Sequence, residues 1–128
     1  MNPAAAGKTY PATMFTVDPQ RVAAFREIFE ESDGVPATCV TVAEFAVMPQ
    51  IVADPELGLD FSRVLHGNQE YEFRRPLEEG ETLEVRCGLG SIRVLGGNAF
   101  LVVVTELVER GGDVVCTARS TLIERAAD

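Results

Sequence analysis

Cysteine is scarce in this sequence and is not arranged for cross-linking or metal binding. The three cysteines, Cys39, Cys87 and Cys116, are odd in number and far apart, and none has the Cys-x-x-Cys spacing. That pattern disfavours both a disulfide framework and a thiolate metal site. We therefore expect a protein of the reducing cytoplasm that carries no metal.

Basic residues and long apolar runs are also lacking. The chain has 11 Lys and Arg against 20 Asp and Glu, a net charge of -9, and its only adjacent basic pair is Arg74 and Arg75. Such a surface repels a phosphate backbone, which argues against binding to nucleic acid. No segment approaches the ~18 uncharged apolar residues of a membrane span, and the N-terminal residues do not resemble a secretion signal. We expect no nucleic-acid partner and no membrane association.

The length of 128 residues fits one domain. A chain of this size buries roughly two-thirds of the surface that its unfolded form exposes, which is enough for one core. Neither a repeat nor a low-complexity linker divides the sequence. We expect a single domain over residues 1–128, with residues 1–13 irregular because small residues and prolines dominate there.

The sequence after residue 17 predicts a first helix. Asp18 and Pro19 form a helix start, because aspartate caps free backbone N–H groups and proline suits the first helical position. Ser32-Asp33-Gly34 would close the helix. Its apolar face would consist of Val22, Phe25, Ile28 and Phe29.

A second helix is expected from about residue 41. Thr41 and Glu44 have the spacing of a capping box, in which each side chain bonds a backbone N–H at the start of the helix. The following residues are apolar around almost the whole helix axis, which is typical of a helix enclosed by protein on more than one side. Pro49 predicts a kink or a break. Asp60 would cap a short helical turn further along the chain.

From residue 66 the apolar period changes from helical to two, which is typical of strands. Tyr71 and Phe73 would share one face, and residues 99–108 are apolar on both faces, as in a central strand. Glycine-containing turns separate at least four antiparallel strands. Helices first and strands later indicate an α+β domain. Its antiparallel sheet would wrap around a buried, mostly apolar helix, which is the single hot-dog fold.

Two segments, GLDFSRVLHGNQEYEFRRPLEEGETLEV and GGNAFLVVVTELVERGGDVVCTARSTLIER, resemble the N-terminal, non-catalytic hot-dog domain of the MaoC-like dehydratase family. That family includes accessory subunits of (3R)-hydroxyacyl-ACP dehydratases and one half of hydratase 2. The resemblance implies a dimer of hot-dog domains joined edge to edge, with an acyl thioester in a tunnel between the two central helices. The partner would be a catalytic MaoC-like chain or a second copy.

The substrate that the resemblance implies is carried on CoA or on the phosphopantetheine of an acyl carrier protein, with no other cofactor. Its binding residues would be Val42, Phe45, Met48, His66, Gly67 and Asn68. An acidic chain is poorly suited to dock an acidic carrier protein. Contacts to the phosphate of the carrier would therefore come from Arg74, Arg75, Arg93 or the partner.

Catalytic members of the family carry Asp and His in a D-x-N-P-x-H motif, which activates a water and exchanges the proton at the substrate α-carbon. The matching stretch here is SDGVPATC, in which Asp33 and Pro36 keep the spacing. Val35 stands where the motif has Asn, and Thr38 stands where it has His. An alcohol does not exchange protons near neutral pH as an imidazole does, so Thr38 does not replace the base. Asp33 beside Gly34 is ordinary turn chemistry, with a catalytic role as the alternative.

Two other residues are low-ranking catalytic candidates. His66, the only histidine, follows the apolar helix, whereas the family's catalytic histidine precedes it. A lone histidine without a visible acid partner favours a structural role over acid–base catalysis. Some hot-dog thioesterases use a carboxylate on the central helix, which makes Glu44 a candidate nucleophile or base. The capping box explains Glu44 without catalysis.

Three functions follow from these patterns. The favoured one is a non-catalytic or weakly catalytic subunit of an (R)-specific enoyl-thioester hydratase or 3-hydroxyacyl-thioester dehydratase, which shapes the acyl tunnel beside a partner carrying D-x-N-P-x-H. The second is a self-sufficient homodimer, either a thioesterase using Glu44 or a divergent hydratase using Asp33 and His66. The third is an acyl-thioester binding or assembly module without turnover.

Overall fold

The computed structural model describes residues 1–30 and 34–127. Within these residues the chain forms five strands, two α-helices and three short 3-10 turns. The 3-10 turns are Pro3–Ala5, Ala37–Cys39 and Phe61–Arg63. The longer elements are β1 (Thr13–Thr16), α1 (Pro19–Phe29), α2 (Val40–Val52), β2 (Val64–Phe73), β3 (Thr82–Leu95), β4 (Asn98–Val108) and β5 (Val114–Glu124).

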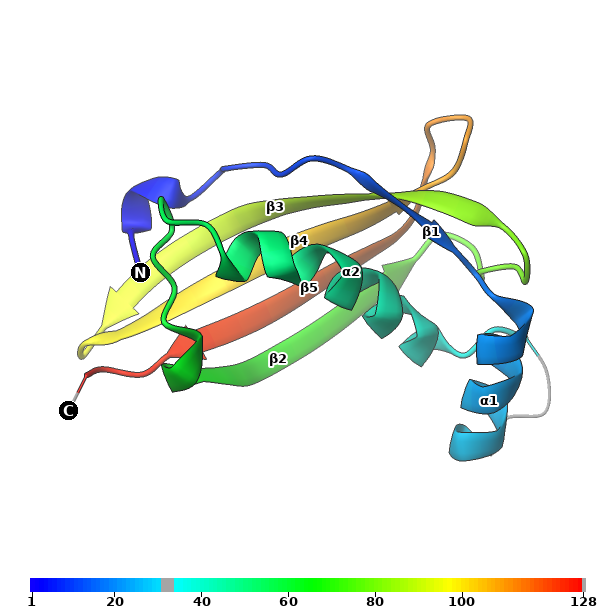
Figure 1. Ribbon diagram of the computed structural model, residues 1–128, viewed down its shortest axis with the longest axis horizontal. Helices are drawn as coiled ribbons and strands as arrows, with labels where there is room; N and C mark the ends of the chain where they lie inside the picture. Colours follow the sequence, from blue (N-terminus) through cyan, green and yellow to red (C-terminus); the bar gives the residue numbers. More distant parts are fainter. Residues whose placement is uncertain (31–33, 128) are drawn as a thin grey trace.

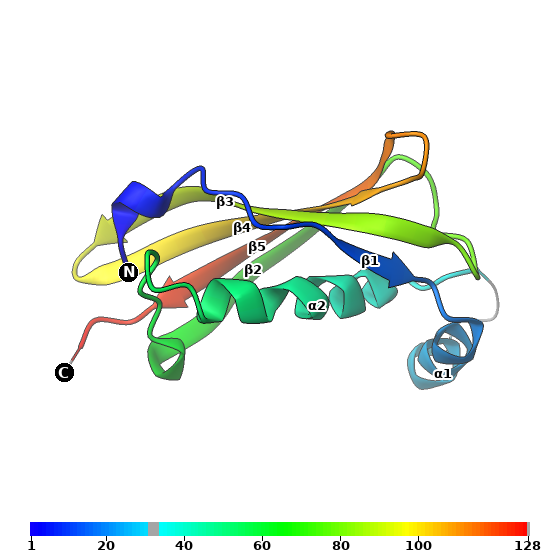
Figure 2. The same ribbon diagram turned by 45° about the horizontal axis from the view of Figure 1, so that its top comes forward.

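All five strands belong to one antiparallel sheet in the order β1-β3-β4-β5-β2. The helix α2 runs along one face of this sheet (Figures 1 and 2), which is the hot-dog arrangement expected from the sequence. The strand β4 is central, and its inward residues Leu101, Val103 and Leu107 are fully buried. The prediction of a central strand over residues 99–108 is therefore confirmed. No helix within the described residues is long and apolar enough to span a membrane.

The helix α1 starts as predicted but does not bury its whole apolar face. Asp18 caps it by accepting a bond from the Gln20 N–H at 2.9 Å, and Val22 is fully buried. Ile28 and Phe29 are instead 70% and 50% exposed. The reason is position, because α1 projects past the end of the sheet (Figure 1) and its last turn has no core to pack against. The helix ends at Phe29, and the expected closing residues Ser32 and Asp33 lie outside the described residues.

The predicted capping box at the start of α2 is wrong. The helix begins at Val40, directly after a 3-10 turn, and no side chain in the described part of the chain caps it. Thr41 and Glu44 lie inside the helix and bond to strands instead. The helix also continues through Pro49 to Val52, so the predicted break is absent. Pro49 lies in the last turn, and the N–H that it lacks would have bonded the carbonyl of Phe45, an exposed residue whose carbonyl water can reach instead.

The sheet covers α2 on one side, and the other side is open. Residues at helical spacing, Val40, Ala43, Glu44, Val47 and Ile51, are buried. Phe45 is 68% exposed, so the expectation of a helix enclosed on more than one side does not hold for this chain. Burying each large aliphatic side chain stabilises the fold by about 1.5–3 kcal/mol, which explains why a helix without a cap holds its place.

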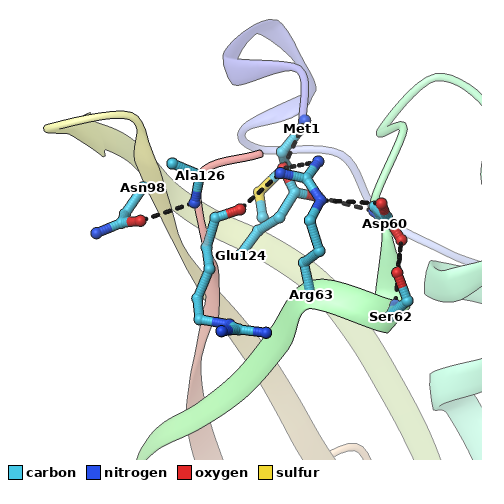
Figure 3. Close-up of polar contacts among 8 residues, drawn as sticks. Met1, Asp60, Ser62, Arg63, Asn98, Glu124 and Ala126 are labelled. Carbon is cyan, nitrogen blue, oxygen red and sulfur yellow. Dashed lines mark hydrogen bonds and ion pairs between the residues drawn. The ribbon is translucent and has the colours of Figure 1, made fainter. Parts of the chain in front are cut away.

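The edge strand β2 is fixed at its first residues by polar contacts with the end of β5 (Figure 3). The Asp60 N–H donates to Glu124 Oε2 at 2.7 Å, and Glu124 also accepts the Met1 ammonium at 3.1 Å. Arg63 donates to Asp60 Oδ2 at 2.9 Å and to the Arg125 carbonyl at 2.6 Å. Asp60 caps the 3-10 turn, as predicted, by accepting from the Ser62 N–H. These contacts hold the strand that carries His66, Gln69 and Tyr71 of the site described next.

Candidate functional site

Glu44 is a buried carboxylate that faces the sheet from α2, with 5% of its surface exposed. Its Oε1 accepts bonds from Gln69 Nε2 at 3.2 Å and Tyr71 Oη at 3.1 Å. Its Oε2 accepts from Gln69 Nε2 at 3.1 Å and Ser120 Oγ at 3.0 Å. A charge taken out of water is tolerated when hydrogen-bond donors replace the water, and three side chains do so here.

The register of the sheet brings these donors together. Gln69 on β2 is paired with Ser120 on β5, so the two side chains emerge side by side from the inward face. Tyr71 is two residues further along β2 and therefore points the same way. It packs against Phe73, with ring centroids 6.3 Å apart, as the predicted shared face requires. Thr41 Oγ1 lies 3.0 Å from Tyr71 Oη and extends the network back to α2.

His66 joins the same network through Gln69. The His66 Nε2 lies 3.1 Å from Gln69 Oε1, and Ser120 Oγ makes a short contact with the same oxygen. In a regular strand, residues 66 and 69 would point to opposite faces, because their separation is odd. The pairing register shifts between His66 and Asn68, which marks a β-bulge at Gly67. The extra residue of the bulge turns His66 to the face of Gln69.

Gly67 suits this bulge because there is little room for a side chain. A Cβ at this position would lie 2.8 Å from Ile123 Cδ1 and 3.2 Å from Ile123 Cγ1. Ile123 lies on β5, where it is paired with Leu65 of β2. The Ile123 side chain thus favours glycine at position 67 of the bulge.

Five residues of the polar network around Glu44 line a cavity of about 380 Å³. That volume falls within the range of small-molecule sites, ~300–1,000 Å³. Its polar lining residues are Thr41, Glu44, His66, Gln69 and Ser120. Its apolar lining residues are Phe45, Met48, Phe61, Val64 and Leu122. The combination suits a ligand with an apolar body and a polar group at one end.

Of the six residues expected to contact a substrate, three line the cavity and three do not. Phe45, Met48 and His66 line the cavity. Val42 is half-buried against the core, and Gly67 forms the bulge. The side chain of Asn68 bonds Glu70 at 3.3 Å at the surface. None of these last three lines the cavity.

Of the residues matched to the catalytic motif, Asp33 lies outside the described residues. The Oγ1 of Thr38 is buried and has no hydrogen-bond partner within the described part of the chain. Sequence reasoning missed Gln69, Tyr71 and Ser120. Two of them could have been found, because Gln69 and Tyr71 are polar groups at inward positions of one strand, where an apolar residue is the rule.

Burial, with the charge of Glu44 in addition, raises the pKa values of three groups near this network. Burial, with the charge of Glu44 in addition, raises the pKa of Tyr71 although the bond from Thr41 acts against it. Burial and Glu44 together raise the pKa of the Cys116 thiol to about 11, and burial raises that of Cys87. Tyr71 therefore stays a donor at neutral pH, and neither thiol offers a thiolate nucleophile.

The basic side chains are not equivalent. Arg75 donates to Glu81 at 2.8 Å and to Glu109 at 3.0 Å, which raises its pKa and keeps it in place. Arg74 and Arg93 are exposed and make no ion pair within the described residues.

The described part of the chain contains no cluster of three His, Cys, Asp or Glu that could hold a metal ion.

The model of the FAS1-like dehydratase domain region matches residues 6–118 of this chain. The chain belongs to this family. A UPF0336 protein from Saccharopolyspora erythraea is 41% identical over 90 residues, which cover 70% of this chain and 58% of the relative. The match therefore spans less than two-thirds of that relative's length.

Solved structures of other proteins have the same fold as this member of the FAS1-like dehydratase region family. The C-terminally truncated HadBC (3R-hydroxyacyl-ACP dehydratase) complex from Mycobacterium tuberculosis superposes with a TM-score of 0.80 at 18% identity. That match covers 93% of this chain and 96% of the other. A MaoC-like dehydratase gives a TM-score of 0.85 at 19% identity, and the match covers 98% of this chain and 43% of the other. The hot-dog fold and the resemblance to MaoC-like dehydratases are thus confirmed.

Proposed function

We propose that this chain is a non-catalytic subunit of a MaoC-type (R)-specific enoyl-thioester hydratase or 3-hydroxyacyl-thioester dehydratase. The observation that carries the proposal is Thr38, which stands where the catalytic motif has histidine. Its hydroxyl is buried with no partner among the described residues, so nothing there activates it as a base. The proton transfers would then come from a partner chain that carries D-x-N-P-x-H.

The role left to this chain is to form one wall of the acyl-binding cavity. Phe45, Met48 and Leu122 give that wall an apolar surface. Each acyl methylene that it removes from water contributes ~0.8 kcal/mol to binding. The binding energy from the acyl chain would hold the thioester in line with the catalytic groups of the partner.

The open edge of the sheet supports a hot-dog partner. Among the described residues, the strand β2 is paired on one side only, which leaves a ten-residue edge with free backbone groups. Phe45, Phe61 and Leu65 beside it are 68%, 58% and 52% exposed. Apolar groups gathered beside an unpaired edge are typical of a protein interface. A second hot-dog chain would cover both, in a cytoplasmic complex.

The carrier of the acyl group is proposed to be CoA or the phosphopantetheine of an acyl carrier protein. A phosphate needs a basic group that is not already neutralised. Arg75 is held by Glu81 and Glu109, so Arg74, on the same loop, is the better candidate on this chain. Arg74 lines a surface depression with Ala37 and Pro76, close to the start of α2.

The test is co-expression with a hot-dog chain that carries D-x-N-P-x-H. We expect a 1:1 complex that hydrates crotonyl-CoA, whereas this chain alone does not. An Asp→Asn change in the motif of the partner should abolish turnover and leave the complex intact. Hydration of crotonyl-CoA by the isolated chain at the rate of the complex would contradict the proposal.

A thioesterase that uses Glu44 is the second candidate, because this carboxylate lines the cavity from the central helix. The four bonds that it accepts argue for a structural role, since a nucleophile or base needs a lone pair directed at substrate. Hydrolysis of acyl-CoA by the isolated chain, lost in Glu44→Gln and kept in Tyr71→Phe, would establish the thioesterase. Absence of hydrolysis in all three proteins would exclude it.

A further inference from the structure

The amide of Gln69 has one orientation only. Its Nε2 lies within 3.2 Å of both oxygens of Glu44, and its Oε1 faces Ser120 and His66. Turning the amide over would place an oxygen that cannot donate against two carboxylate oxygens that cannot donate. The carboxylate of Glu44 therefore fixes the Gln69 oxygen toward His66.

This orientation determines which nitrogen of His66 carries the proton. An amide oxygen has no proton to give, so the contact of 3.1 Å between Gln69 Oε1 and His66 Nε2 requires the nitrogen to donate. In the neutral ring the other nitrogen, Nδ1, is then an acceptor. Nδ1 has no hydrogen-bond partner within the described residues, and His66 lines the cavity.

We propose that Glu44 and Gln69 are positioning residues that hold His66 in its Nε2-protonated form, so that Nδ1 accepts a hydrogen bond from a ligand in the cavity. The ligand class is an apolar chain that bears a hydroxyl group. The first part stands on the geometry alone. The ligand part rests on the proposed function, because it takes the cavity to be an acyl site.

The bulge at Gly67 is the structural condition for this arrangement. Without the extra residue, His66 would point to the outer face of the sheet and Gln69 to the inner face. The ring would then be out of reach of both the cavity and the amide. Glu44 on α2, Gln69 on β2 and the bulge thus act together on one imidazole.

Nitrogen-15 NMR tests the proton position directly, because the chain has a single histidine and its two ring nitrogens need no assignment by mutation. The isolated chain, labelled in histidine, is measured at alkaline pH so that the signals of the neutral ring are observed. We expect Nε2 protonated and Nδ1 unprotonated. In Gln69→Leu the ratio of the two tautomers should move toward the Nδ1-protonated form by about fivefold, the factor that one net hydrogen bond is worth.

Tyr71→Phe is the matched control. It removes one donor from Glu44 but keeps both contacts from Gln69, so the tautomer ratio should stay as in the wild type. A wild-type ratio equal to that of Gln69→Leu, in variants that keep the wild-type circular dichroism spectrum, would overturn the positioning role. A purely structural contact would change stability and leave the ratio unmoved.

The ligand part is tested with two thioesters of N-acetylcysteamine, octanoyl and 3-hydroxyoctanoyl, which share every amide donor and differ in one hydroxyl. We expect the hydroxylated thioester to bind about fivefold more tightly, to shift the Nδ1 resonance, and to lose this advantage in Gln69→Leu. Equal binding of both, with Nδ1 unmoved, would overturn the ligand part and leave the acyl cavity standing. Binding of neither would overturn the ligand part together with the acyl cavity, and the tautomer result would stand by itself.

Discussion

Gln69 and Ser120 lie opposite each other on β2 and β5, and both donate to the carboxylate of Glu44 on α2. The buried Glu44 side chain thereby connects the helix to two strands. Gln69 is 25 residues and Ser120 is 76 residues from Glu44 in the sequence. The contact fixes how α2 sits over the edge of the sheet that carries the cavity. It also makes Glu44 a test of stability that is separate from any test of turnover.

Replacing Glu44 by Ala should destabilise the fold strongly. The change leaves Gln69, Tyr71 and Ser120 without their acceptor, and an unsatisfied buried polar group costs about 1–3 kcal/mol. We expect the free energy of unfolding in urea to fall by about 3 kcal/mol. Glu72→Ala, at an exposed position on β2, should change it by less than about 0.5 kcal/mol. Equal effects of the two changes on the free energy of unfolding would show that the buried network does not stabilise the fold.

Gly67→Ala should disturb the bulge through Ile123. The new Cβ would lie 2.8 Å from Ile123 Cδ1, so the isoleucine must rotate or the strand must shift. We expect a loss of about 1 kcal/mol in the wild-type background, since the clash is with the far end of a side chain. In an Ile123→Ala background the same change should cost much less. A double-mutant cycle in urea measures the coupling, and additive effects would place the strain elsewhere.

Substitutions at Phe45 and Val47 should separate the effect on acyl binding from the effect on stability. Phe45 is exposed and lines the cavity, so Phe45→Ala should leave the free energy of unfolding within about 0.5 kcal/mol. The same change should weaken binding of the octanoyl thioester. Val47→Ala, one turn away from Glu44 on the buried side, should cost roughly 1–3 kcal/mol of stability. Unchanged acyl binding in Phe45→Ala would remove this residue from the proposed site.

Asp54 should make stability depend on acid pH. Lys8, at 2.7 Å, and Tyr10 hold the pKa of this carboxyl down to about 2. A pKa that is lower in the folded state means that the unfolded chain binds the proton more readily. The contribution of Asp54 is therefore complete above the unfolded pKa of ~3.9 and is lost as pH falls toward 2. Urea unfolding at pH 5, 4 and 3 should show this fall in the wild type and a smaller one in Asp54→Asn.

The elements that local sequence determines were predictable. The start of α1 depends on Asp18 and Pro19 alone, and β4 depends on an apolar run that only a central strand can bury. The exposure of Ile28 and Phe29 was not predictable, because periodicity tells which side of a helix is apolar but not where the sheet ends. The spacing of Thr41 and Glu44 fits a capping box equally well, and only the strands from elsewhere in the chain decide against it.

The site followed the same division. The apolar residues Phe45 and Met48 could be named from the helix pattern. The meeting of His66 with Gln69 could not, because it depends on one extra residue in β2 whose effect on register appears only once β5 is in place. Polar networks of this kind are non-local. The members lie on α2, β2 and β5, and partners from different elements meet only when the whole sheet has formed.

The free edge of β2 has a thermodynamic consequence. The inward side of this strand carries His66 and Gln69 at the cavity, and its outer edge offers backbone groups to a neighbouring strand. A partner at the edge and a ligand in the cavity would act on the same ten residues. If the partner changes the affinity for the ligand by some factor, the ligand must change the affinity for the partner by the same factor. Measured dissociation of such a complex, with and without an acyl thioester, would then report on the cavity without any turnover.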